Sequence, residues 1–153
     1  MLGKIILLIE DNPDHQDLVQ RALRKEGVPH LCVGVKDVDE AMDFLHARGG
    51  WEERDRKLTP GLVLVDLKLA RSHGNDVIRA LRKDAATRHV PAVVLTSSVE
   101  QRDVEASYEA GANAYVRKEI DFDDFARNLR ATVTFWLDVN VAPEVTVRAK
   151  AGI

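Results

Sequence analysis

The fold of this chain is decided by the aliphatic run Lys4-Ile5-Ile6-Leu7-Leu8-Ile9 and by the polar turn that follows it, Glu10-Asp11-Asn12-Pro13. An unbroken aliphatic run of this length is typical of a β-strand buried on both faces. The turn predicts the start of a helix, with Asp14 as its capping residue. Gly27 stands where that helix would end. Its apolar positions recur at helical spacing: Leu18, Val19, Ala22 and Leu23.

The same alternation of a short apolar run and an amphipathic helix recurs along the chain. Further strands are predicted at His30–Val35, which is weaker and nearer an edge, and at Leu62–Val65, Pro91–Leu95 and Ala114–Val116. Further helices are predicted to start at Asp37 or Asp39 and to span Gly74–Lys83, Glu100–Ala110 and Asp121–Leu137. The charged stretch His46–Pro60 is expected to be a surface loop.

Five strands alternating with five helices predict an α/β fold, a doubly wound parallel sheet with helices on both faces. In such sheets ligands bind outside the carboxyl ends of the strands, at the point where the strand order reverses. The residues that end the strands are therefore the candidates for function.

Polar side chains with complementary chemistry end four of the predicted strands. They are Glu10 and Asp11 after the first strand, Asp66 after the third, Thr96 after the fourth and Lys118 after the fifth. Neighbouring carboxylates repel one another unless a cation lies between them, and oxygen ligands favour a hard cation such as Mg²⁺. A hydroxyl and a lysine beside them suit an anion. Each motif alone is an ordinary turn or cap, but together they predict a phosphoryl-transfer site with Asp66 as the nucleophile.

These residues, in this order, resemble the response-regulator receiver domain of two-component signalling, from about Lys4 to Leu137. The resemblance implies the flavodoxin-like, CheY-like form of the fold, with strand order 2-1-3-4-5. It implies that Asp66 accepts a phosphoryl group from a histidine kinase, and that the chain catalyses only its own phosphorylation and dephosphorylation. The implied Mg²⁺ ligands are Glu10, Asp11, Asp66 and the backbone carbonyl of Lys68. Thr96 and Tyr115 are the implied switch residues, and Lys118 the lysine that pairs with the phosphate.

Finer features are similar to the single-domain regulators paired with bacterial phytochromes. They are the run Glu10–His15, the long loop before the third strand, Leu95–Ser98 and the ending Phe135–Asn140. This similarity implies a phytochrome-type histidine kinase as partner, with a phosphotransfer protein as a further candidate. Output would pass through protein–protein contacts.

Two positions depart from the family pattern. Glu119 follows Lys118 where the family usually has proline, so the peptide bond there is expected to be trans or strained. Ala70 also replaces a usual proline, four residues after Asp66, which should loosen the loop Leu67–His73. Neither change removes a reacting group, so phosphorylation remains the favoured interpretation. The alternative is a receiver-like interaction module that works without phosphorylation.

Two other classes fit less well. The pattern typical of aspartyl-phosphate phosphatases has a second acid two residues after the nucleophile. This chain has Lys68 at that position. A nucleotide or flavin binder would need a Gly-rich or hydroxyl-rich loop after the first strand, where this chain has acids.

Composition limits the remaining possibilities. The chain has 153 residues and a net charge of −3, from 22 Lys and Arg against 25 Asp and Glu, which argues against a nucleic-acid or membrane-surface binder. Cys32 is the only cysteine, and no apolar run is long enough to span a membrane, so a cytoplasmic protein is expected. We expect a receiver domain over 1–138, no attached output domain, and a C-terminal extension over 139–153.

The extension continues the apolar character of the last helix, with Val139, Val141, Val145 and Val147. It is too short to fold alone, so it is either a frayed terminus or an arm that packs across a second copy. We expect a homodimer formed by the fifth helix, including Trp136, and this tail.

Overall fold

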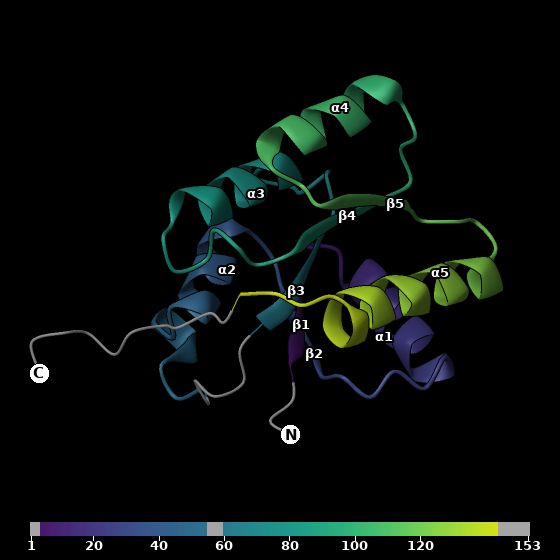
Figure 1. The fold of residues 1–153 in the computed structure, drawn as a ribbon, viewed down its shortest axis with the longest axis horizontal. Coiled ribbons are helices and arrows are strands. Elements are labelled where there is room, and N and C mark those ends of the chain that lie inside the picture. The colour runs from purple at the N-terminus through teal and green to yellow at the C-terminus, as the bar shows by residue number, and fades with distance from the viewer. Residues whose placement is uncertain (1–3, 55–59, 144–153) are drawn as a thin grey trace, which may run out of the picture.

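Within residues 4–54 and 60–143, which the computed structural model describes, five parallel strands form one sheet in the order β2-β1-β3-β4-β5 (Figure 1). The strands are β1 (Ile5–Ile9), β2 (Cys32–Val35), β3 (Pro60–Val65), β4 (Ala92–Thr96) and β5 (Ala114–Arg117). The α-helices are α1 (Pro13–Lys25), α2 (Val38–Leu45), α3 (Gly74–Lys83), α4 (Gln101–Ala110) and α5 (Phe122–Thr134). The predicted α/β class, the strand order and the edge position of the second strand are confirmed.

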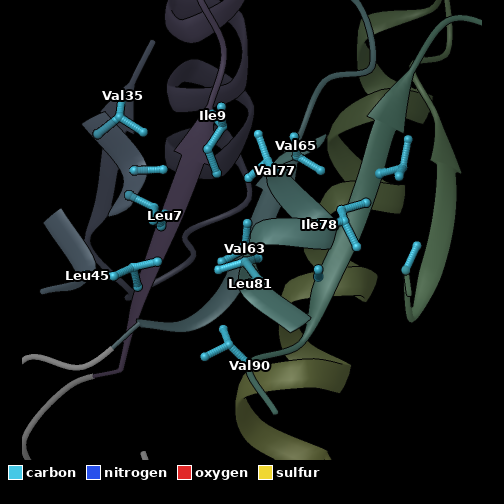
Figure 2. Close-up of a cluster of buried hydrophobic side chains, with 14 of the residues drawn as sticks. Leu7, Ile9, Val35, Leu45, Val63, Val65, Val77, Ile78, Leu81 and Val90 are labelled. Atoms are coloured by element: carbon cyan, nitrogen blue, oxygen red, sulfur yellow. The ribbon is translucent and has the colours of Figure 1, made fainter. Parts of the chain in front are cut away.

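Both faces of the central strands are buried, and successive residues alternate between them. Ile6 and Leu8 of β1 belong to a cluster under α1 and α5, together with side chains of β3 and β4. Leu7 and Ile9 belong to a second cluster, under α2, α3 and α4 (Figures 1 and 2). Each fully buried aliphatic side chain of this kind contributes about 1.5–3 kcal/mol of transfer free energy. Because neither face is exposed to solvent, the strands read as continuous aliphatic runs.

Side-chain caps begin four of the five α-helices and thereby set the direction of the chain after four of the strands, the last of them being Asp121 at the start of α5. The cap of α1 is Asn12, whose Oδ1 accepts a hydrogen bond from the Asp14 backbone N at 2.9 Å, so the prediction of Asp14 was wrong. Pro13 is the first helical residue, and its missing N–H leaves the Asp14 N–H as the first donor to be satisfied. Asp37 caps α2, one of the two predicted starts. His73 caps α3 through Nδ1, which accepts from the Asn75 N.

Arg82 of α3 ties together the amino end of β4 and the carboxyl end of α4. Its guanidinium donates hydrogen bonds to the carbonyls of Gly111 at 3.0 Å and Val90 at 2.8 Å. It also donates to the Arg88 carbonyl at 3.0 Å and to Asn113 Oδ1 at 2.8 Å. Burial lowers the pKa of Arg82, and this set of acceptors compensates for the lost hydration.

The last helix differs in form from the prediction. Regular α-helix ends at Thr134, and a π-helical turn continues it through Phe135–Val139. Leu137 of this turn is buried against Gly61 of β3, where an added Cβ would lie 2.6 Å from Leu137 Cδ2. Trp136 packs partly buried beside the same core. The tail residues 144–153, including Val145 and Val147, lie outside the described residues.

The charged stretch after α2 contains a short 3₁₀ turn, Gly49–Trp51. Trp51 is half-buried and meets the Phe44 ring edge to face, with 5.0 Å between ring centroids. Residues 55–59 of this stretch lie outside the described residues. Among the helices that are described, none has the length and apolar character needed to cross a membrane.

Candidate functional site

The carboxyl ends of four strands surround one pocket of about 320 Å³. It contains all five residues predicted from the strand ends, together with Lys68. The lining residues are Glu10, Asp11, Asn12, His15, Asp66, Lys68, Thr96, Ser97 and Lys118. Parallel pairing produces this gathering, because Ile9 pairs with Val65 and Val65 with Val94, so that the residues just beyond each strand lie at one edge. Asn12 and Ser97, which directly follow Asp11 and Thr96, also line the pocket.

Asp66 and Lys118 form the centre of the pocket. Lys118 Nζ lies 3.7 Å from Asp66 Oδ2, and both side chains are largely buried, at 14% and 12% exposure. The Lys118 backbone N donates to the Thr96 carbonyl at 2.7 Å, which continues the β4–β5 pairing into the site. No cis peptide bond occurs in the described ranges, so the bond between Lys118 and Glu119 is trans, one of the two predicted outcomes. The substitution of the usual proline therefore leaves the lysine in reach of Asp66.

Glu10 is a buried acid with little to stabilise its charge. Neither of its carboxylate oxygens accepts a well-formed hydrogen bond from the described part of the chain, although His15 Nδ1 lies 2.8 Å from Oε1. Burial raises the pKa of Glu10 to about 8, the adjacent Asp66 adds to this effect, and Lys118 opposes it. Glu10, His15 and Asp66 each offer a ligand atom, all within 4.8 Å of one another. Buried, unsatisfied carboxylate oxygens at this spacing fit a hard divalent cation.

Asp11 lies beside this group but is directed elsewhere. Its Oδ2 accepts a hydrogen bond from the backbone N of Ala70, in the loop between β3 and α3. Of the predicted metal ligands, the structure thus brings Glu10 and Asp66 together and leaves Asp11 at the rim. His15, in the first turn of α1, is exposed, and its Nδ1 lies 2.8 Å from Glu10 Oε1.

Gln16 holds the turn that carries the two acids, and sequence reasoning missed it. Its Nε2 donates to the Glu10 carbonyl at 2.6 Å and to the Val35 carbonyl at 3.4 Å. The amide can approach β2 because Gly34 has no side chain: a Cβ there would lie 2.4 Å from Gln16 Oε1. A glycine inside a strand is a recognised sign of such a close approach, and it is the signal that the sequence offered.

Thr96 and Tyr115 both contact Ser98, in the loop between β4 and α4. The buried Thr96 accepts a hydrogen bond through Oγ1 from the Ser98 N at 3.4 Å. The Tyr115 hydroxyl donates to the Ser98 carbonyl at 2.9 Å, and burial of the ring raises the pKa of Tyr115. Tyr115 does not line the pocket itself, and its hydroxyl is connected to Thr96 through this loop.

A protein-family comparison agrees with this geometry. The model of the response regulator receiver domain matches residues 6–130, a range that includes every residue of the pocket. The chain belongs to the response regulator receiver domain family. The resemblance to a receiver domain, which rested on the residues at the strand ends, is therefore confirmed.

Relatives of this receiver domain cover almost all of its length. Response regulator Rcp1 of Synechocystis sp. is 34% identical over 140 residues, which are 92% of this chain and 93% of Rcp1. Among solved structures, the phosphorylated cyanobacterial phytochrome response regulator RcpA superposes with a TM-score of 0.81 at 32% identity, covering 93% of this chain and 99% of RcpA. The Mn²⁺-bound form of Rcp1 gives a TM-score of 0.78 at 32% identity, covering 93% and 100%.

Proposed function

We propose that this receiver domain works as a single-domain response regulator that accepts a phosphoryl group on Asp66 from a histidine kinase. The observation that carries the proposal is the pairing of Asp66 with Lys118 at 3.7 Å, beside the buried Glu10. An Asp66 carboxylate oxygen would attack the phosphorus of a phosphohistidine, the P–N bond would break, and the histidine would leave. The lysine would then pair with the new phosphoryl oxygens.

Mg²⁺ is the proposed cofactor, held by Glu10, Asp11, Asp66 and the Lys68 backbone carbonyl. The unsatisfied Glu10 oxygens and the three carboxylates that line the pocket, Glu10, Asp11 and Asp66, support this assignment. When bound, the ion would supply positive charge that offsets the carboxylates and the incoming phosphoryl oxygens. The related Rcp1 has been solved with Mn²⁺ bound, which is consistent with a divalent-cation site here.

The proposed switch runs through Thr96 and Tyr115. A phosphoryl group adds about 1.5–2 negative charges and several acceptors, to which the Thr96 hydroxyl can donate. Thr96 Oγ1 now accepts from the Ser98 N, and the Ser98 carbonyl accepts from Tyr115. Movement of Thr96 toward Asp66 would therefore displace the partner of Tyr115, and the surface of α4 and β5 would change with it.

A phytochrome-type kinase is the proposed partner, because both RcpA and Rcp1 resemble this chain over nearly its full length and RcpA is described as a phytochrome response regulator. A phosphotransfer protein is a second candidate partner. The alternative function, an interaction module without phosphorylation, rests on Ala70 and Glu119. The trans bond at Glu119, with Lys118 still near Asp66, favours phosphorylation over this alternative.

Intact mass spectrometry after incubation with acetyl phosphate tests the function directly. We expect one added phosphoryl group per chain when Mg²⁺ is present and none when the cation is removed with EDTA, because no cation would then offset the negative charges of Asp66 and of the donor's phosphoryl oxygens. A phosphorylated phytochrome-type kinase should transfer its phosphoryl group faster than an unrelated histidine kinase does. No labelling by any donor would favour the phosphorylation-independent module.

We also propose a homodimer formed through the end of α5. Phe135, Val139 and Val141 are 47%, 62% and 93% exposed, and the first two line a groove of about 530 Å³ beside α1. Light scattering should give the mass of two chains, and the double variant Phe135→Glu, Val139→Glu the mass of one. Ile120→Glu is the matched control, since Ile120 is an exposed apolar residue in the β5–α5 loop. A monomeric wild-type chain would contradict this assembly.

A further inference from the structure

The Asp11 carboxylate lies at the boundary between two pockets. On one side is the pocket of Asp66, and on the other a pocket of about 250 Å³ that Asp11 shares with Ala70 and Arg71. In the structure Asp11 is engaged on the second side, because its Oδ2 accepts a hydrogen bond from the Ala70 N–H. It is absent from the group of ligand atoms that Glu10, His15 and Asp66 form.

Backbone contacts fix both ends of the loop that carries Ala70, and at its tip the partly buried Leu69 packs against the core. The Gly74 N donates to the Leu67 carbonyl at 2.8 Å, and Lys68 and His73 form an antiparallel bridge. Gly74 also packs so closely that an added Cβ would lie 2.2 Å from the Asp66 carbonyl oxygen. The hydrogen bond from Ala70 to Asp11 spans 59 positions of sequence and ties the tip, residues 69–72, to the β1–α1 turn.

An N–H that donates to a carboxylate offsets part of its negative charge and holds it in one orientation, so the carboxylate binds a cation on its other side less strongly. We propose that the Ala70 N–H competes with the divalent cation for Asp11, so that cation binding at the Asp66 pocket releases the tip of the β3–α3 loop. This inference rests on the proposed function, because it takes that pocket to be the cation site. Ala70 would then have two roles. Its N–H would lower the affinity of the pocket for the cation, and the loss of its hydrogen bond would free the loop next to Asp66 when the cation binds.

Calorimetric titration with Mg²⁺ tests the competition. Ala70→Pro removes the N–H, and we expect the affinity for Mg²⁺ to rise at least about tenfold, the low end of the net effect of one hydrogen bond to a charged group. Ala70→Gly is the matched control: it changes the same residue but keeps the N–H, so its affinity should stay near that of the wild type. In an Asp11→Asn background, the gain from Ala70→Pro should disappear.

A second measurement uses the unmodified chain and does not depend on whether the proline variant folds. In ¹⁵N-labelled wild-type protein, the Ala70 amide proton should shift upfield and exchange faster with solvent as Mg²⁺ is added. Mg²⁺ saturation with an unmoved Ala70 amide would overturn the competition while leaving the cation site intact. A folded Ala70→Pro variant with unchanged or weaker affinity would do the same. Absence of any Mg²⁺ binding by the wild type would instead overturn the proposed cation site, and the competition with it.

Discussion

Asp66→Asn is expected to reduce phosphoryl labelling to an undetectable level. The amide nitrogen and oxygen of asparagine are poor nucleophiles at phosphorus, whereas the Asp66 carboxylate lies at the centre of the pocket with Lys118 Nζ at 3.7 Å. The substitution also removes one of two neighbouring carboxyls and thus their repulsion, so the fold should be retained or stabilised. The loss of labelling would then reflect lost chemistry rather than unfolding.

Intact mass after incubation with acetyl phosphate and Mg²⁺ measures this effect, with circular dichroism as the check on folding. Asp17→Asn is the matched control, because Asp17 is an exposed acid of α1 whose Oδ2 lies 3.8 Å from Arg21 Nη1. The control should be labelled as fully as the wild type. Persistent labelling of the Asp66→Asn variant at another residue would mean that Asp66 is not the phospho-acceptor.

Glu10 should make the cation-free protein less stable as the pH rises. Its pKa is raised from 4.5 to about 8, first by burial and then by the adjacent Asp66. Between these two pH values the folded chain holds a proton on Glu10 that the unfolded chain has released. The free energy of unfolding therefore falls with rising pH across this window, by up to about 1.4 kcal/mol per pH unit. The stabilisation is complete below pH 4.5 and is lost as the pH passes 8.

Urea denaturation in EDTA at several pH values between 5 and 8.5 tests this dependence. Glu10→Gln keeps the shape of the side chain but cannot ionise, so the variant should lose the slope and exceed the wild type in stability by about 2–4 kcal/mol at the alkaline end. Mg²⁺ should flatten the wild-type curve, because a cation favours the charged carboxylate. Parallel curves for the two proteins would show that Glu10 does not hold a proton in the folded chain.

Most of the fold was predictable because strands that are buried on both faces have continuous aliphatic sequences, which are easy to identify. The predicted bounds of the third helix, Gly74–Lys83, match α3, and the strand ends differ by one or two residues. Two details depended on backbone hydrogen bonding, which side-chain periodicity does not report. Asn12 rather than Asp14 caps α1, and the last helix changes to π geometry at Phe135.

The residues that form the candidate site could be predicted from the sequence, but the hydrogen bonds between them and their neighbours could not. Topology alone brings Asp66, Thr96 and Lys118 to one edge, so their residue types at the strand ends were sufficient. The contact of Asp11 with Ala70, by contrast, depends on which of several nearby groups an exposed carboxylate meets. The clamp of Gln16 on Glu10 likewise requires knowing that β2 lies beside β1 in a definite register.

The Arg82 cluster has a mechanical consequence for signalling. Gly111, which ends α4, is held by the Arg82 guanidinium at 3.0 Å, whereas the opposite end of α4 follows the loop that contains Ser98. The Ser98 hydroxyl donates a hydrogen bond to Asp103 in the first turn of α4. A displacement that starts at Thr96 and moves Ser98 therefore acts on this end of α4, while Arg82 holds the other end. We expect α4 to rotate about Gly111 rather than to slide along the sheet. Partners of this receiver domain would then recognise a change in the angle between α4 and the sheet.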